Sequence, residues 1–434
     1  MSGAIYNREA ETLGADARAA LQLERLRRSV AWAVERVPFH RERLGAAPIE
    51  RLADLAALPF MRKSDLREHY PFGLFAVEPR ELARVHASSG TKGKPTVVGY
   101  TAGDLDVWRE VMARVMVAAG ARSGDMLHVA YGYGLFTGGL GFHDGAERLG
   151  MTVVPVSSGN TARHHLLLQD LRPAGLGATP SFALHIAESL AEQGGDPRAL
   201  GIRYGMFGAE PWTEGLRAAL ERAYGCHAFD VYGLSEIIGP GVAGECEARE
   251  GLHVCDDHFL PEVVDPATGT PHAPGTEGEL VLTTLTKRAL PMIRYRTGDI
   301  TTLTTGPCVC GRTSARIARI KGRADDMLVV KGVNLYPSEV EAALLAVEDL
   351  QPHYLLLVDR TATLARLEVQ VEPAPALLER CGGFQPDHPL LGAVQRRVTA
   401  RLREVTGLTI ELTLVAPHTI PRSEGKAVRV VEKR

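Results

Sequence analysis

The sequence contains few cysteines, six in 434 residues, which is too few for a disulfide framework in so long a chain. It also contains no run of about 20 apolar residues, the length that a membrane-spanning helix needs. Its first twenty residues include no apolar signal core. We therefore predict a cytoplasmic protein with no membrane partner.

Neither sign of charge dominates. Lys and Arg total 49, Asp and Glu total 52, and the formal net charge is -3. Because no overall positive field attracts phosphate backbones, we expect no nucleic-acid partner. A small anionic ligand would need a local positive site.

Alternating apolar runs and helical stretches indicate an α/β fold. Apolar residues at helical spacing predict a helix over 19–37, which Pro38 ends. From about 81 to 286 short apolar runs alternate with helical stretches, as in a layered fold whose strands lead into functional loops. The predicted strands are Met126–Ala130, Thr152–Val156, Tyr204–Phe207, His227–Tyr232 and Glu279–Leu285.

The composition changes near Gly322. Beyond it the pattern predicts strand, helix, two strands, helix and strand, which make an α+β unit of about 110 residues. The predicted elements are 327–330, 337–346, 354–358, 367–371, 390–405 and 409–415. We predict a large multi-layer N-terminal domain over residues 1–324 and a smaller C-terminal domain over residues 325–434.

A loop rich in Gly, Ser, Thr and Lys follows the apolar segment 84–87. Its glycines let backbone N–H groups approach an oxyanion, and its hydroxyls and lysines add donors and charge, which suits a polyphosphate. The spacing is not that of a Walker loop, and a mobile surface turn is the alternative interpretation. The candidate phosphate-binding residues are Ser88, Ser89, Gly90, Thr91, Gly93 and Lys94.

Five later segments follow this loop in a fixed order. They are FGAEP (207–211), DVYGLSE (230–236), YRTGD (295–299), GRADD (322–326) and RSEGK (422–426). Together they resemble the motif series of the adenylate-forming superfamily of acyl-CoA synthetases, luciferases and peptide-synthetase adenylation domains. The segments 87–100, 131–141, 257–260 and 322–337 are also similar to those of phenylacetate-CoA ligases, and the resemblance runs from about Leu21 to the end.

The resemblance implies an AMP-forming acid–thiol ligase of the phenylacetate-catabolism type. Its N-terminal domain would bind AMP, and ATP, Mg²⁺, coenzyme A and an aryl carboxylate would be its ligands. Because the first step joins two anions, the carboxylate and the α-phosphate, catalysis should consist mostly of charge neutralisation and alignment. Lys426 would bridge the two groups, as a long-stemmed ammonium can. A solvated tail lysine is the alternative.

The resemblance also assigns the nucleotide site. Glu236 would bind Mg²⁺, which prefers carboxylate oxygens, although a plain surface Glu is the alternative. Asp299 and Arg323 would hold the ribose hydroxyls. The adenine site would be formed by Gly208, Ala209, Glu210, Pro211, Asp230 and Tyr232, with the Tyr232 ring stacking on the base. Asp325 matches the hinge that lets the small domain present different faces in the two steps.

The acyl pocket would be lined by Tyr131, Phe136, Gly138 and Gly139, and completed by Pro240. Aromatic walls with glycines opposite them leave a slot for a planar ring, and the segment 131–141 contains no Lys or Arg to bind a second acid group. Core packing of the two aromatic residues is the alternative interpretation.

Two cysteines one residue apart, Cys308 and Cys310, follow Cys246 and His253. Three thiolates and one imidazole are the ligand set of a closed, structural zinc site, and free buried thiols are the alternative. Cys255 is a competing fourth ligand. We interpret Cys226 and Cys381 as ordinary core or loop cysteines.

Three rival functions share these motifs. One is a ligase for a hydroxy- or amino-substituted aryl acid in a biosynthetic pathway, and another is a deazaflavin-adenylylating synthetase that uses no thiol. The third is a noncatalytic nucleotide-binding regulator, against which the joint presence of Lys426, Glu236 and Asp299 argues. The sequence leaves the oligomeric state open, with a homodimer as one option.

Overall fold

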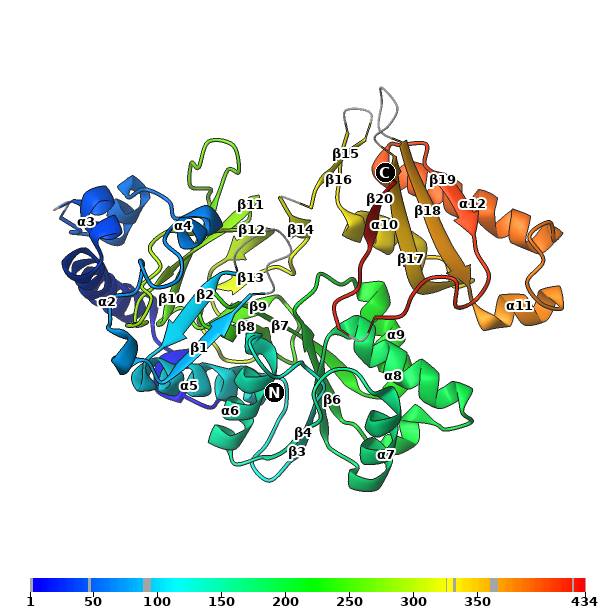
Figure 1. The fold of residues 1–434 in the computed structure, drawn as a ribbon, viewed down its shortest axis with the longest axis horizontal. Helices are drawn as coiled ribbons and strands as arrows, with labels where there is room; N and C mark the ends of the chain where they lie inside the picture. The colour runs from blue at the N-terminus through cyan, green and yellow to red at the C-terminus, as the bar shows by residue number, and fades with distance from the viewer. Residues whose placement is uncertain are drawn as a thin grey trace. The chain divides into compact units, whose positions relative to one another are not determined.

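The computed structural model (Figure 1) describes residues 3–45, 48–88, 95–324, 326–330, 333–359, 366–423 and 425–433. Of the candidate residues, Ser89, Gly90, Thr91, Gly93, Lys94 and the hinge residue Asp325 lie outside these ranges. The chain divides into two compact units. Unit 1 comprises Met1–Ala178, Leu200–Ala209 and His227–Arg319, and unit 2 comprises Thr179–Ala199, Glu210–Cys226 and Ile320–Arg434.

Unit 1 is built on a mixed sheet. Its parallel part is formed by β3 (Met126–Val129), β4 (Thr152–Pro155), β5 (Gly175–Ala178), β6 (Tyr204–Gly208) and β7 (His227–Leu234). Its antiparallel part contains β8 (Gly239–Glu245), β9 (Leu252–Val254), β10 (Phe259–Val264), β11 (Glu277–Thr284), β12 (Tyr295–Thr304) and β13 (Arg316–Ile317). The strand order β10-β11-β12-β13-β9-β8-β7-β6-β5-β3-β4 places the change of direction at β7.

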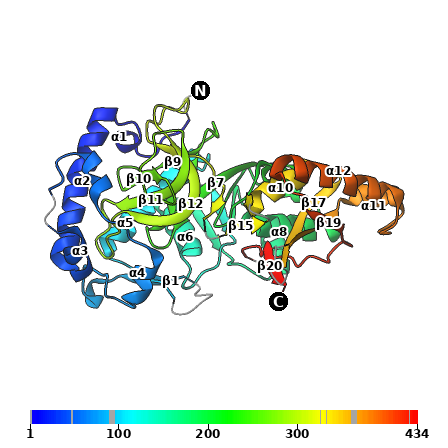
Figure 2. The same cartoon turned by 90° about the horizontal axis from the view of Figure 1, so that it is seen from above.

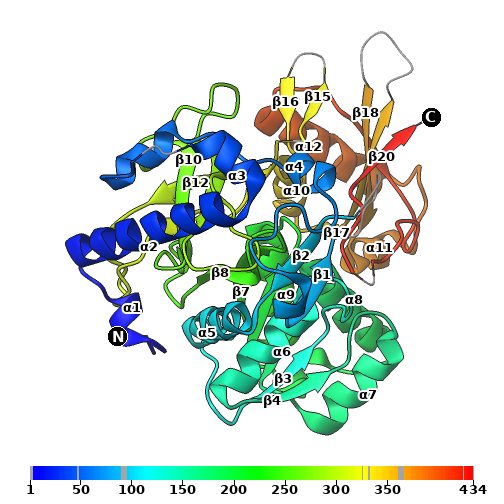
Figure 3. The ribbon, with the colours of Figure 1, turned by 60° about the vertical axis from the view of Figure 1, so that its left-hand side comes forward.

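Helices cover this sheet. They are α1 (Arg8–Glu11), α2 (Ala15–Arg36), α3 (Pro38–Leu44), α4 (Lys63–Glu68), α5 (Ala102–Ala118), α6 (Thr137–Leu149) and α7 (Thr161–Leu171). The long helix α2 lies beside β10 and β11 (Figure 2), where the Ser29 hydroxyl donates to the Thr284 carbonyl at 2.7 Å. The adjacent helices α5 and α6 (Figure 3) can approach closely because Gly145 has no side chain. A Cβ at this position would lie only 2.4 Å from the Met112 Cβ.

The predicted strands and helices of the N-terminal part are confirmed, with ends shifted by a few residues. For example, the helix predicted over 19–37 spans Ala15–Arg36. A two-stranded hairpin, β1 (Arg84–Ala87) with β2 (Val97–Tyr100), stands apart from the main sheet. Its two strands flank the predicted phosphate loop.

Unit 2 combines two helices from the middle of the chain with the C-terminal residues. The helices are α8 (Pro180–Glu192) and α9 (Glu214–Tyr224), and the sheet order is β19-β18-β17-β20. The remaining elements are α10 (Pro337–Leu345), α11 (Pro375–Cys381), α12 (Pro389–Thr406), β14 (Gly322–Arg323), β15 (Leu328–Val330), β16 (Val333–Leu335), β17 (Leu350–Asp359), β18 (Arg366–Pro373), β19 (Glu411–Leu414) and β20 (Val430–Lys433). The six predicted C-terminal elements occur in the predicted order, and the structure adds β16, α11 and β20, which were not predicted. The boundary at residue 325 stays a prediction.

The core of unit 2 forms where the apolar residues of α10 and α12 pack against the sheet that contains β17 and β18. Val340 and Leu344 of α10 pack with Val398 of α12 against Leu356 and Val369 of the central strands, and all five are fully buried. By the rule of about 25 cal/mol per Å² of buried apolar surface, such a cluster supplies most of the gross stabilisation of a small α+β unit. In the described part of the chain, no helix combines the length and apolarity that crossing a membrane requires.

Candidate active site

The segments FGAE and YGLSE lie where two neighbouring parallel strands, β6 and β7, end. The carboxyl edge of such a sheet is the usual position for ligand-binding loops. Gly208 must lack a side chain here, because a Cβ would lie 2.1 Å from the carbonyl oxygen of Val231. Ala209 adopts φ 68°, a left-handed conformation that costs free energy outside glycine and is typical of functional turns.

Tyr232 and Asp299 meet inside unit 1. The Tyr232 hydroxyl donates a 2.6 Å hydrogen bond to the Asp299 carboxylate, and both residues are buried. The predicted base-stacking ring and the predicted ribose ligand are therefore in contact, although their segments are more than sixty residues apart. The predicted contact of Asp299 with the ribose hydroxyls stays a prediction.

Asp230 is held by a buried charge network. Its backbone N–H donates to the Glu245 carboxylate at 2.7 Å, and its own carboxylate lies 3.5 Å from the Arg319 guanidinium. Arg319 also faces Glu245 at 3.8 Å. One guanidinium thus balances two carboxylates beside the middle of β7, which the sequence alone did not reveal.

Glu236 is buried but paired. The Lys63 ammonium lies 3.2 Å from the Glu236 carboxylate, and the buried Lys287 ammonium donates to the Glu236 carbonyl at 3.1 Å. Burial lowers the pKa of Lys287 to about 8, while Asp104 and Glu236 act in the opposite direction. The Glu236 carboxylate is therefore paired with one cation in the structure, and its predicted role as a Mg²⁺ ligand stays a prediction.

Sequence reasoning missed Lys63 and Lys287 as partners of Glu236. The sequence did contain a signal for Lys287, because this lysine lies within a largely uncharged segment (281–293) whose residues are expected to be buried. A buried lysine requires a hydrogen-bond acceptor. Lys63 had no such signal, since it begins the short polar helix α4.

Ser88 is the phosphate-loop residue that the structure describes. Its backbone N–H donates to the Thr96 carbonyl at 3.0 Å, and its hydroxyl accepts from the Thr96 N–H at 3.3 Å. The last ladder pair of the hairpin is Ala87 with Val97. The predicted loop therefore begins at a closed hairpin end, which gives it a rigid base.

The predicted acyl residues gather at the start of α6. Tyr131 is buried, and its ring stacks on Phe142 with centroids 4.7 Å apart. Phe136 is the N-cap residue of α6, and Gly138 and Gly139 form the first turn. A Cβ at Gly138 would lie 2.6 Å from the Phe136 ring. The absence of a side chain at Gly138 therefore makes room for that ring.

Two further contacts define the surroundings of Gly139 and Pro240. A Cβ at Gly139 would lie 2.7 Å from the carbonyl oxygen of Gly132, a backbone atom that cannot rotate away. The Pro240 carbonyl accepts a 2.9 Å hydrogen bond from the buried Trp108 indole. The structure therefore groups all five predicted residues in unit 1, and the glycines set how closely α6 approaches 131–133.

The remaining nucleotide-site residues, Glu210, Pro211 and Arg323, belong to unit 2. Pro211 follows Glu210 ahead of α9, and Arg323 lies in β14. Their predicted contacts with the adenine and ribose stay predictions.

The segment that carries Lys426 is firmly anchored in unit 2. Arg422 pairs with the fully buried Glu372 through two hydrogen bonds of 2.8 and 2.9 Å, and Glu372 also accepts from the Ile420 N–H at 2.9 Å. Burial alone would raise the pKa of Glu372, but these donors lower it below its ordinary value. The Ser423 hydroxyl donates to the Lys426 carbonyl at 2.7 Å, and Lys426 itself is exposed.

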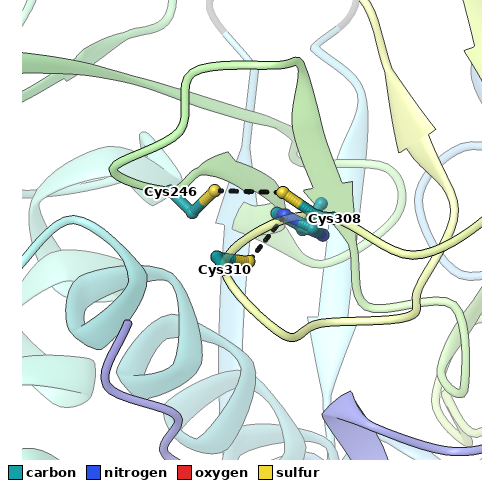
Figure 4. Close-up of side chains that lie close together, drawn as sticks. Cys246, Cys308 and Cys310 are labelled. Carbon is teal, nitrogen blue, oxygen red and sulfur yellow. Dashed lines mark hydrogen bonds between the residues drawn. The ribbon is translucent and has the colours of Figure 1, made fainter. Parts of the chain in front are cut away.

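A second centre lies at the loop between β12 and β13. The side chains of Cys246, His253, Cys308 and Cys310 are all buried, and their candidate ligand atoms lie within 4.8 Å of one another. The Sγ atoms of Cys246 and Cys308 are 3.8 Å apart (Figure 4). The Cys310 Sγ lies 3.5 Å from the His253 Nε2.

These separations fit a tetrahedral metal site. With Zn–S bonds of about 2.3 Å and Zn–N bonds of about 2.0–2.1 Å, the edges of a tetrahedron are about 3.8 Å for S to S and about 3.6 Å for S to N. The other ring nitrogen of His253 lies 3.2 Å from the Ser314 hydroxyl, which fixes the ring as an outer-shell partner should.

The electrostatic surroundings also favour a thiolate. The hydrogen bond from Cys246 lowers the pKa of Cys310, and His253 and the nearby Arg312 guanidinium act in the same direction. Cys255 is buried outside this cluster, so it is not the fourth member. Cys226 and Cys381 are both buried and take no part in this cluster, in keeping with their interpretation as ordinary core or loop cysteines.

The fold agrees with the comparisons to known proteins. Residues 16–285 match the AMP-binding enzyme family, and residues 332–434 match the AMP-binding enzyme C-terminal domain. A crystal structure of 2-hydroxyisobutyryl-CoA ligase in the postadenylation state matches with a TM-score of 0.92 at 32% identity, covering 99% of this chain and 92% of that chain. These features define an adenylate-forming enzyme of the AMP-binding class.

Two curated relatives narrow the class. Phenylacetate-coenzyme A ligase of Thermus thermophilus is 52% identical over 440 residues, covering 98% of this chain and 99% of the relative. The enzyme of the same name from Escherichia coli K12 is 47% identical over 431 residues, covering 98% and 97%. The chain belongs to the phenylacetate-coenzyme A ligase family, as the motifs predicted.

Proposed function

We propose that this AMP-forming acid–thiol ligase acts on phenylacetate. With ATP and Mg²⁺ it would form phenylacetyl-adenylate and release pyrophosphate, and coenzyme A would then take the acyl group and release AMP. The observation that supports phenylacetate as the substrate is the 47–52% identity to four phenylacetate-coenzyme A ligases over nearly the whole chain. We also propose that the enzyme works in the cytoplasm.

The chain's own residues have distinct tasks in this scheme. Lys426 would neutralise the two approaching anions, and Asp299 would hold the ribose hydroxyls as a hydrogen-bond acceptor. Glu236 would bind the Mg²⁺, which supplies charge neutralisation at the phosphates. The bound ring would lie near Tyr131 and Phe136, shielded from water.

The substrate proposal is tested by kcat/KM for phenylacetate, ring-hydroxylated phenylacetates, benzoate and hexanoate under identical ATP and coenzyme A. We expect the arylacetates to be preferred, because an apolar slot without Lys or Arg rewards burial of a phenyl ring and offers no partner to a second acid. A preference for hexanoate, or for a substituted benzoate over every arylacetate, would contradict it. Pyrophosphate release without AMP formation would indicate the deazaflavin-type rival, because an adenylylating synthetase leaves the AMP on its cofactor.

Gly139→Ala should raise the KM for phenylacetate about tenfold and leave the KM for ATP within about twofold. The new Cβ would press on the Gly132 carbonyl at 2.7 Å and displace the segment that carries Tyr131. The matched control is Gly103→Ala in α5, where the nearest atom to a new Cβ, the Thr101 hydroxyl, lies 3.8 Å away. Equal changes in both KM values would mean that Gly139 does not belong to the acyl pocket.

We further propose that Cys246, His253, Cys308 and Cys310 bind one structural zinc ion. The support is their burial, the S–S and S–N separations, and the Ser314 hydroxyl beside His253. Four protein ligands leave no open position, so the metal would stabilise the fold and take no part in the reaction.

A further inference from the structure

The two peptide groups that flank Lys426 are bonded to side chains from the β5–α8 connection, the first turn of α8 and the β6–α9 connection. One Glu210 carboxylate oxygen accepts from the Ala427 N–H at 2.8 Å, and the other accepts from the Ser181 N–H at 2.8 Å. The Gly425 carbonyl accepts from the Thr179 hydroxyl at 2.7 Å and from the Ser181 hydroxyl at 3.2 Å. All of these residues belong to unit 2.

The carboxylate of Glu210 is well suited to hold a backbone segment. Burial raises its pKa above the ordinary value, and the donors from Ser181 and Ala427 lower it again. A desolvated carboxylate that receives two N–H bonds resists rotation, since losing either donor leaves a buried acceptor unsatisfied.

Two other polar contacts connect α8 and the start of α9 with the C-terminal elements. The Glu188 carboxylate lies 2.7 and 2.9 Å from the His353 Nε2. The Thr213 hydroxyl donates to the Glu341 carboxylate at 2.8 Å. These contacts hold the C-terminal sheet in the arrangement in which Glu210 reaches the Lys426 segment.

We propose that Thr179, Ser181 and Glu210, together the Lys426 clamp, position Lys426 for adenylate formation and release it for thioester formation. The proposal rests on the proposed role of Lys426. The contacts fix the peptide groups on both sides of the lysine, so the clamp orients the ammonium group without touching the reacting atoms. The second step needs a different face of the C-terminal domain. Loss of the clamp's hydrogen bonds should therefore not slow thioester formation.

The test compares the two half-reactions in Glu210→Ala and Thr179→Val. Adenylate formation is measured by phenylacetate-dependent exchange of labelled pyrophosphate into ATP, and thioester formation by the conversion of synthetic phenylacetyl-adenylate with coenzyme A. We expect each variant to slow exchange about tenfold while thioester formation stays within about twofold. The matched control is Glu379→Gln, an exposed carboxylate of α11 in the same unit, which should change neither half-reaction.

Thr179→Val separates positioning from nucleotide binding. It removes the hydroxyl that bonds Gly425 but keeps the side-chain shape, so kcat for exchange should fall while the KM for ATP stays constant. An increase in the KM for ATP alone, or an equal loss in both half-reactions, would overturn the clamp.

Hydrogen–deuterium exchange of the ligand-free protein tests the contacts independently of activity. The Ala427 amide should be protected in the wild type and should exchange faster in Glu210→Ala. Unprotected Ala427 in the wild type would overturn the clamp. Protection combined with a wild-type enzyme that cannot exchange pyrophosphate with any arylacetate would instead contradict the proposed function.

Discussion

Lys426→Ala should slow acyl-adenylate formation by about 10²–10³, the scale of losing one preorganised electrostatic group. The carboxylate and the α-phosphate repel each other as they approach, and the lysine ammonium is the group proposed to offset that repulsion. The segment is held by Glu372, Arg422 and Ser423 through backbone and side-chain contacts that do not involve the Lys426 side chain. The variant should therefore fold normally.

The measurement is single-turnover formation of phenylacetyl-adenylate, followed by conversion of supplied adenylate with coenzyme A. The second step should change much less than the first, so the intact second half-reaction serves as the internal control for folding. Equal losses in both steps with an unchanged melting temperature would contradict the bridging role of Lys426.

Cys310→Ser should lose bound zinc and lower the melting temperature, on the order of 10 °C, while some activity remains. A serine hydroxyl is a poor zinc ligand, and without the metal three buried polar groups would face one another unsatisfied. The loop around Cys310 also contacts the start of the chain through Arg312 and Glu11 at 2.5 Å. Loss of the metal should loosen both segments together.

The matched control is Cys255→Ser, because Cys255 is equally buried yet lies outside the ligand cluster. Metal analysis should find about one zinc per chain in the wild type and in Cys255→Ser, and much less in Cys310→Ser. Wild-type protein purified without chelator that contains no metal and has reactive thiols at the four positions would contradict the zinc site.

The sequence predicted only part of the helices and strands, namely those whose apolar periodicity reports local conformation directly. The helix over 19–37 and the C-terminal order of elements both follow from the spacing of Leu, Val and Ala. The motif residues could likewise be named, since FGAEP and YGLSE are contiguous segments. The carboxyl edge then followed from the parallel arrangement of β6 and β7.

Contacts between distant segments were not predictable. Nothing in the spacing indicates that Lys63 faces Glu236, or that Thr179 bonds the Gly425 carbonyl. Nor does the spacing show that the Phe136 ring lies where a Cβ at Gly138 would stand. Such packing depends on how helices and loops approach one another, which no local pattern encodes.

The most direct test of the central proposal is AMP release by the wild-type enzyme with ATP and Mg²⁺, measured with and without phenylacetate and coenzyme A. We expect sustained AMP formation only when both are present, with phenylacetyl-CoA appearing in equal amount. AMP formation that requires no thiol, or no turnover with any arylacetate, would contradict an arylacetate–coenzyme A ligase.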